Sequence, residues 1–120
     1  MEEARSVSGS FPGFLEAGDL DGKDVTLKMK VVRQPGPNDK GLDGKPIDKP
    51  IVVFENARKE WVLNKTNART IRLLYGDQFG EWKGKAVTIY PTTCPAFGET
   101  VACIRVRSIN PETGKEPDLF

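Results

Sequence analysis

The sequence predicts one small, mainly β domain built from five short strands and a single helix. Two observations predict this class. Apolar and polar residues alternate with a period of two in several short segments, and one longer segment has apolar residues at spacings of three and four. The length of 120 residues suits one domain. We divide the chain into an N-terminal arm at 1–20, the domain at 21–110 and a C-terminal tail at 111–120.

The first three strands are expected at residues 25–31, 50–54 and 59–63. In the first strand the alternation turns Lys28 and Lys30 outward. It places four apolar side chains on the core face: Val25, Leu27, Met29 and Val31. A short polar turn joins the second and third strands, as in a hairpin.

The helix is expected at residues 64–75, with Asn64 or Thr66 as its N-cap and Gly76 in the left-handed position after its end. Its apolar stripe consists of Ala68, Ile71, Leu74 and Tyr75, and its basic stripe of Lys65, Arg69 and Arg72. Lys65 and Asn67 are expected to stay free at the positive end of the helix dipole, which attracts phosphate or carboxylate. The alternative is a cap that only sets where the helix begins.

The last two strands are expected at 86–90 and 101–107, joined by a hairpin loop at 91–100. Residues 34–49 are rich in Pro and Gly and have no helix or strand period. We expect a long mobile loop there, which is either functional or a tolerated insertion.

Three strands, a helix and two further strands are the element order of a five-stranded OB-fold-like barrel. A barrel also removes the exposed edges that short strands would otherwise present. An open α+β sandwich would use the same elements, and it remains the alternative.

The composition argues against an enzyme. The chain has no histidine, and no nucleophile or carboxylate pair has a visible basic partner. Cys94 and Cys103, the only two cysteines, are expected to be reduced, small apolar residues rather than metal ligands, so we expect no metal and no cofactor. The chain has no membrane-spanning run and does not begin like a secretory signal, so we expect a cytoplasmic protein.

The candidate binding residues are outward cations and aromatic rings on the predicted strands. A single nucleic-acid strand needs positive charge for its phosphates and flat rings on which its bases stack. The set consists of Lys28, Lys30, Phe54, Trp61, Tyr90, Arg105 and Arg107. The alternative is that Phe54 and Trp61 are core residues and that the basic side chains are ordinary solvated exteriors.

Charge is distributed unevenly along the chain. Residues 21–110 hold 16 Lys and Arg against 10 Asp and Glu, a net of +6, whereas the arm and the tail are acidic. The tail closes with Asp118, Leu119 and Phe120. It resembles the acidic, Phe-terminated tails of bacterial and phage single-strand binding proteins, which implies docking on a replication or recombination partner. The alternative is an ordinary polar terminus.

A wider resemblance rests on residues 14–23, 62–71, 75–77, 81–85 and 104–107. Its most specific part is Leu-Asn-Lys-Thr-Asn at 63–67, followed by Trp-x-Gly-Lys at 82–85. With these motifs the chain resembles a family of small, mostly uncharacterised phage and prophage proteins, which implies a viral setting.

Two functions follow as hypotheses. The first is a non-catalytic protein that binds single-stranded nucleic acid, with DNA expected, as an accessory of phage replication or recombination. The second is a phage protein-interaction module, such as an inhibitor of a host enzyme or a scaffold component, that grips its partner with the barrel surface or the 34–49 loop.

Overall fold

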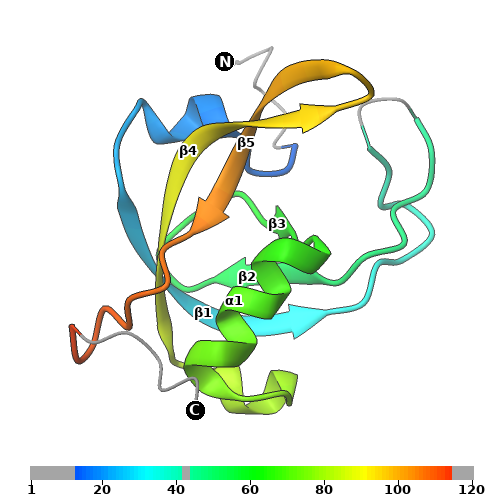
Figure 1. Cartoon of the computed structure of the whole chain (residues 1–120). Coiled ribbons are helices and arrows are strands. Elements are labelled where there is room, and N and C mark those ends of the chain that lie inside the picture. Colours follow the sequence, from blue (N-terminus) through cyan, green and yellow to red (C-terminus); the bar gives the residue numbers. More distant parts are fainter. Residues whose placement is uncertain (1–12, 42–43, 115–120) are drawn as a thin grey trace, which may run out of the picture.

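The structure is a computed structural model that describes residues 13–41 and 44–114. Five antiparallel strands curl into a half-barrel that carries one α-helix, so the predicted mainly β class is confirmed (Figure 1). The elements are η1 (Ala17–Leu20), β1 (Val25–Arg33), β2 (Ile51–Phe54), β3 (Trp61–Val62), α1 (Lys65–Tyr75), η2 (Phe79–Trp82), β4 (Ala86–Ala96) and β5 (Glu99–Val106). Within the described ranges no helix is long and apolar enough to cross a membrane.

Strand β1 is the centre of the sheet, whose order is β3-β2-β1-β4-β5. Its first half pairs with β4 and its second half with β2, so the strand has to bend between the two partners. The register shifts between Met29 and Val31, which places Lys30 in a β-bulge. Because the extra residue reverses the alternation, Val31 is 46% exposed, and the prediction that it faces the core is wrong.

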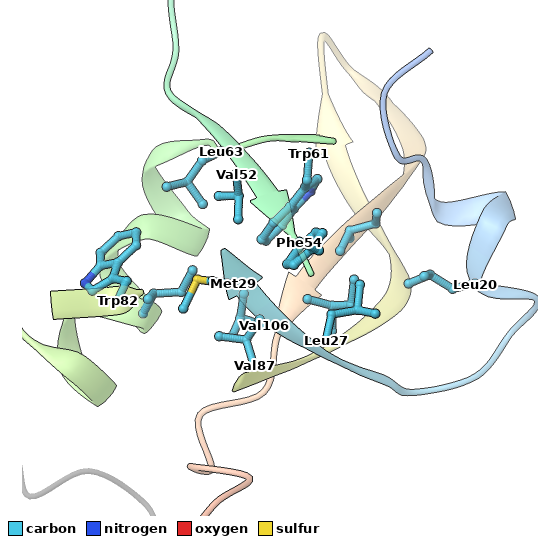
Figure 2. Packing of buried hydrophobic residues seen from close by; sticks show 13 residues of the cluster. Leu20, Leu27, Met29, Val52, Phe54, Trp61, Leu63, Trp82, Val87 and Val106 are labelled. Atoms are coloured by element: carbon cyan, nitrogen blue, oxygen red, sulfur yellow. The ribbon is translucent and has the colours of Figure 1, made fainter. Parts of the chain in front are cut away.

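The core lies inside the curl of the sheet and is closed by α1 and η2 (Figure 2). Met29, Val87 and Ile89 are buried there, as the alternation predicts. Trp82 of η2 is also buried, and its indole N–H donates to the Gly76 carbonyl at 2.9 Å. Burying this large ring while satisfying its only polar group fixes the connector after α1 against the core.

Helix α1 begins and ends where its cap residues predict. The Asn64 side chain accepts from the Asn67 backbone N–H at 2.9 Å, and Gly76 is the C-cap. Its φ of 100° is positive as expected, but its ψ of 176° lies outside the left-handed helical region that was predicted. Ile71 is fully buried and Leu74 is half-buried, whereas Leu73 is exposed. The predicted apolar stripe therefore faces the core, with Ile71 at its centre.

The seam between β3 and β5 is covered by α1 and by residues 13–20, and the two strands do not pair with each other. On one side, Asn67 of α1 donates its amide to the Ile104 carbonyl of β5 at 2.9 Å. On the other side, the Leu15 N–H donates to the Glu60 carbonyl at 2.7 Å, and Lys59 pairs with Asp19 at 2.9 Å. Residues 13–20, which the sequence assigns to the arm, therefore pack on the half-barrel.

The residues expected to form a loop at 91–100 instead extend both strands to a two-residue turn at Phe97 and Gly98. Arg107 donates its N–H to the Thr88 carbonyl, and alternate residues of β4 from Thr88 onward bond to β5 in the same way. Pro91 and Pro95 lie between these residues, so their nitrogens point away from β5. Proline therefore costs no ladder bond here, which is why β4 continues through both positions.

Cys94 and Cys103 form a disulfide across the two strands of this hairpin. In the register Cys103 faces Thr92 and Cys94 faces Val101, so the two cysteines are diagonal neighbours on one face, with Cα atoms 6.1 Å apart. This separation is suited to a disulfide. The prediction of two reduced cysteines is wrong, because it did not include the strand register that brings them together.

Candidate functional site

The two aromatic rings predicted to stack on bases lie in the core. Phe54 and Trp61 are each 3% exposed and stack on one another, with ring centroids 6.1 Å apart (Figure 2). A base cannot reach either ring without disrupting the fold. Both are core residues, which is the alternative interpretation that the sequence left open.

Tyr90 and Arg107 are at the surface but are committed to each other. The Arg107 guanidinium carbon lies 3.6 Å from the centre of the Tyr90 ring, a cation–π contact. The same guanidinium donates two hydrogen bonds of 3.0 Å to the Asp24 carboxylate and lowers the pKa of that carboxyl. The positive charge of Arg107 is thus balanced, and one face of the ring is covered.

The remaining predicted cations come from β1 and β5. Arg105 lies opposite Tyr90 on β5 and donates to its neighbour's carbonyl, that of Ile104, at 3.2 Å. Lys28 is opposite Ala86 on β4. Lys30 lies in the bulge of β1, where the pairing of this strand changes from β4 to β2. Within the described residues none of the three has an acidic partner.

A groove of about 740 Å³ lies on the outer face of β1 and β3. Trp61 points into the core, so its neighbours Glu60 and Val62 point outward into the groove. The loop after β1 forms one wall, and Phe14 from the N-terminal segment lines the groove as well. Apolar atoms thus line it alongside charged groups.

Arg33 connects the loop that forms one wall of the groove to Glu60, the residue before β3. Its guanidinium donates to the Asp39 carboxylate at 2.8 and 3.0 Å and to Glu60 at 2.7 and 3.1 Å. These contacts raise the pKa of Arg33 and, chiefly through its hydrogen bonds, lower the pKa of Asp39 to about 2. The three charged groups satisfy one another, so their role is to position the loop on the sheet.

The loop at 34–49 is folded back on itself. Asp39 accepts from the Gly36 N–H at 2.6 Å, and its own carbonyl accepts from the Ile47 N–H at 3.0 Å. Lys40 and Pro46 form an isolated β-bridge. The described part of the loop contains no regular helix or strand, as expected, yet Asp39 holds it in a defined shape that the sequence did not predict.

Two cations of the groove remain available to a ligand. Lys40 and Arg58 are exposed, and no other described side chain pairs with them. The acidic group left beside them is Glu16, since Arg33 holds Asp39 and Glu60. An aromatic ring with free cations nearby can hold a flat ring and an anionic group together.

Sequence reasoning missed Phe14, Lys40 and Arg58 because each lies outside a predicted strand. Phe14 was assigned to the arm, Lys40 to the long loop and Arg58 to a turn. The only signal was the suggestion that the 34–49 loop is functional. The packing of Phe14 depends on tertiary contacts that no local pattern encodes.

The hairpin tip carries a second exposed ring. Phe97 is 104% exposed and has a φ of 53°, a left-handed conformation that bulky residues rarely adopt. The following Gly98, with a φ of 80°, suits its position in the turn. An apolar ring that is both strained and solvated contributes nothing to the core, so it is a candidate contact residue.

The helix cap is less available than expected. Lys65 is exposed, but Asn67 is 1% exposed and its amide is bonded to β5, so the prediction that it stays free is wrong. The predicted docking residues Asp118, Leu119 and Phe120 lie outside the described residues. The described ranges contain no cluster of three or more His, Cys, Asp or Glu suited to a metal ion.

No protein-family model matches this chain, and neither does a curated protein or a solved structure. The site is therefore interpreted from its own chemistry.

Proposed function

We propose that this chain is a non-catalytic protein that binds single-stranded nucleic acid, with DNA as the ligand, through the groove on β1 and β3. The observation that carries the proposal is the groove itself, where Phe14, Lys40 and Arg58 lie together beside the loop that follows β1. A stacking ring with unpaired cations is what a single strand requires, whatever its sequence.

The arrangement of the strands supports the same proposal. Strand order β3-β2-β1-β4-β5, with α1 between β3 and β4, is compatible with an OB-type barrel left open between β3 and β5. OB-type barrels bind oligonucleotides on the face of their second and third strands, beside the loops that follow the first and fourth strands. The groove borders β3 and the first of these loops, and Phe97 lies in the second.

In the proposed complex each group has a separate task. Phe14 stacks on a base, while Lys40 and Arg58 contact the phosphates on either side. Arg33, Asp39 and Glu60 keep the loop wall in position and do not bind phosphate, because the one guanidinium is already bonded to two carboxylates. The proposed setting is phage replication or recombination, and the tail residues 118–120 would dock on a protein of that machinery.

The test is a fluorescence anisotropy titration of labelled oligo-dT, with a duplex of equal length as the control ligand. We expect the single strand to bind in preference, with affinity that falls with salt by a slope of about −0.7 per phosphate contact. K40A/R58A should weaken binding and flatten that slope by about two contacts. K65A/R69A, a matched loss of two cations on the exposed face of α1, should leave both unchanged.

Arg105 and Arg107 provide the comparison between the two candidate faces. R105A/R107A should have a smaller effect than K40A/R58A, since Arg107 is already paired with Asp24. The groove assignment fails if R105A/R107A removes binding while K40A/R58A retains it. The nucleic-acid proposal as a whole fails if oligo-dT does not bind.

The protein-interaction module remains the second candidate, and Phe97 is the observation that favours it. A fully solvated ring at the tip of a disulfide-tied hairpin is suited to insertion into a partner's apolar pocket. Phe97→Ala separates the candidates, because it leaves all the groove cations in place. Binding of oligo-dT through the groove should therefore persist in this variant, whereas binding of a protein partner through Phe97 should be lost.

A further inference from the structure

The outer edge of β5 is open for pairing. Among the described residues the strand pairs with β4 on one side only, so alternate residues direct their backbone N–H and C=O groups away from the sheet. These residues are Thr100, Ala102 and Ile104. The Ile104 carbonyl accepts from Asn67, whereas no hydrogen bond within the described part of the chain reaches the outward groups of Thr100 or Ala102. Both residues are exposed.

The two edges of the hairpin differ in how they are protected. Along the free edge of β4, Pro91 and Pro95 lack the outward N–H groups, so only that of Thr93 remains between them, which hinders the addition of a strand. The stretch of β5 from Thr100 to Cys103 has no proline, no charge and no bulge, and Val101 is 42% exposed there. Unprotected edges of this kind pair readily with another strand.

The charges that flank this edge are self-complementary. Glu99, Val101, Cys103 and Arg105 share one face of β5, since they alternate along a regular strand. An antiparallel copy centred on Val101 would place Thr100 opposite Ala102 of the other copy, so that their free groups exchange four hydrogen bonds. Glu99 would then be the diagonal neighbour of the other copy's Arg105, within reach of long side chains.

We propose that a second copy of this chain occupies this edge and forms a two-fold symmetric dimer with a sheet continuous across both β5 strands. Neither Glu99 nor Arg105 has an ion-pair partner among the described residues, and the dimer supplies one to each. The disulfide between Cys94 and Cys103 holds β5 on β4 at this point, so the edge is ordered before pairing. The interface is isologous, as expected for a dimer of this symmetry.

Sedimentation velocity of the full chain, without nucleic acid and over a range of concentrations, tests the proposal. The wild type should form a concentration-dependent dimer. Ala102→Pro removes an outward N–H without a ladder bond to β4 and should give a monomer. Thr93→Pro is the matched control, because it makes the same change on the free edge of β4, and it should still dimerise. Circular dichroism checks that both variants fold.

Charge exchange tests the register independently. Glu99→Arg and Arg105→Glu should each weaken the dimer by about tenfold or more, since two pairs are lost per dimer. The double variant E99R/R105E should restore it. A wild type that stays monomeric, an A102P that dimerises like the wild type, or a double variant as weak as the single variants would each overturn the proposal. None of these outcomes depends on the binding of nucleic acid.

Discussion

Asp39 connects the groove wall both to the sheet and to the rest of the loop. Its carboxylate accepts from Arg33 and from the Gly36 backbone, while its carbonyl accepts from Ile47 across the loop. Asp39 therefore helps to close the loop on itself and also fixes it to the sheet. Because Arg33 also binds Glu60, the fixation extends to the segment that leads into β3.

This arrangement predicts a specific response to acid. The pKa of Asp39 is lowered from 3.8 to about 2 in the folded chain, so the carboxylate stabilises the fold fully above pH 4 or so. That contribution should be lost as the pH falls through 2, where the folded form takes up the proton. A carboxyl-carbon NMR titration of Asp39 should give a midpoint near pH 2, and a midpoint at the ordinary value would contradict the ion pair between Asp39 and Arg33.

Asp39→Asn is the companion variant. It should abolish the acid response of the loop amides while leaving those of α1 unchanged, since no described residue of α1 forms a hydrogen bond or ion pair with Arg33, Asp39 or Glu60. An unchanged loop response in this variant would mean that another carboxyl closes the loop.

At the level of elements, α1 has two separate roles. It covers the open end of the half-barrel with Ile71, and it satisfies the Ile104 carbonyl at the edge of β5 through Asn67. The motif Leu-Asn-Lys-Thr-Asn is explained by these contacts. Leu63 is buried, Asn64 caps the helix, and Asn67 connects it to β5.

Three alanine substitutions should separate the faces of the helix. Ile71→Ala should cost about 2–5 kcal/mol through lost burial and the remaining cavity. Leu74→Ala should cost less, because the side chain is half-buried. Leu73→Ala, at a side chain 49% exposed, should cost under about 1 kcal/mol. Urea unfolding midpoints in any other order would show that the helix has a different rotation on the sheet.

The strands show which local patterns were sufficient for prediction. Alternation placed Leu27, Met29 and Val87 correctly, because neighbouring strands force these residues to one side. It failed at Val31, since the bulge arises from the need of β1 to serve two partners. It also failed at Pro91 and Pro95, where only the direction of the ladder bonds shows that proline is tolerated.

At the level of the whole molecule, the half-barrel stays open between β3 and β5, and α1 and residues 13–20 cover the seam. The mainly β class, the five strands and the single helix could be predicted from the sequence. The groove could not, because Phe14, Lys40 and Arg58 come from three segments that only the tertiary fold brings together. The disulfide was missed for the same reason.

The fold also determines which of the predicted cations are available to a ligand. The outward set was expected to form one basic face, but Arg107 is paired with Asp24, and Lys30 lies at the bulge. The net charge of a segment therefore did not indicate which of its cations are available. In the groove, Arg33 occupies the carboxylates of Asp39 and Glu60. Lys40 and Arg58 therefore have no ion-pair partner among the described residues and are available to a ligand.

The most direct test of the central claim, that the groove binds a single strand, is an NMR titration of the isotope-labelled chain with unlabelled oligo-dT. Amide shifts should change at Phe14, along the loop wall from Arg33 to Gly41, and from Arg58 to Val62, with the largest changes beside Lys40. Shift changes confined to the outer face of β4 and β5, around Tyr90 and Arg105, would contradict the claim, and so would a spectrum that does not change.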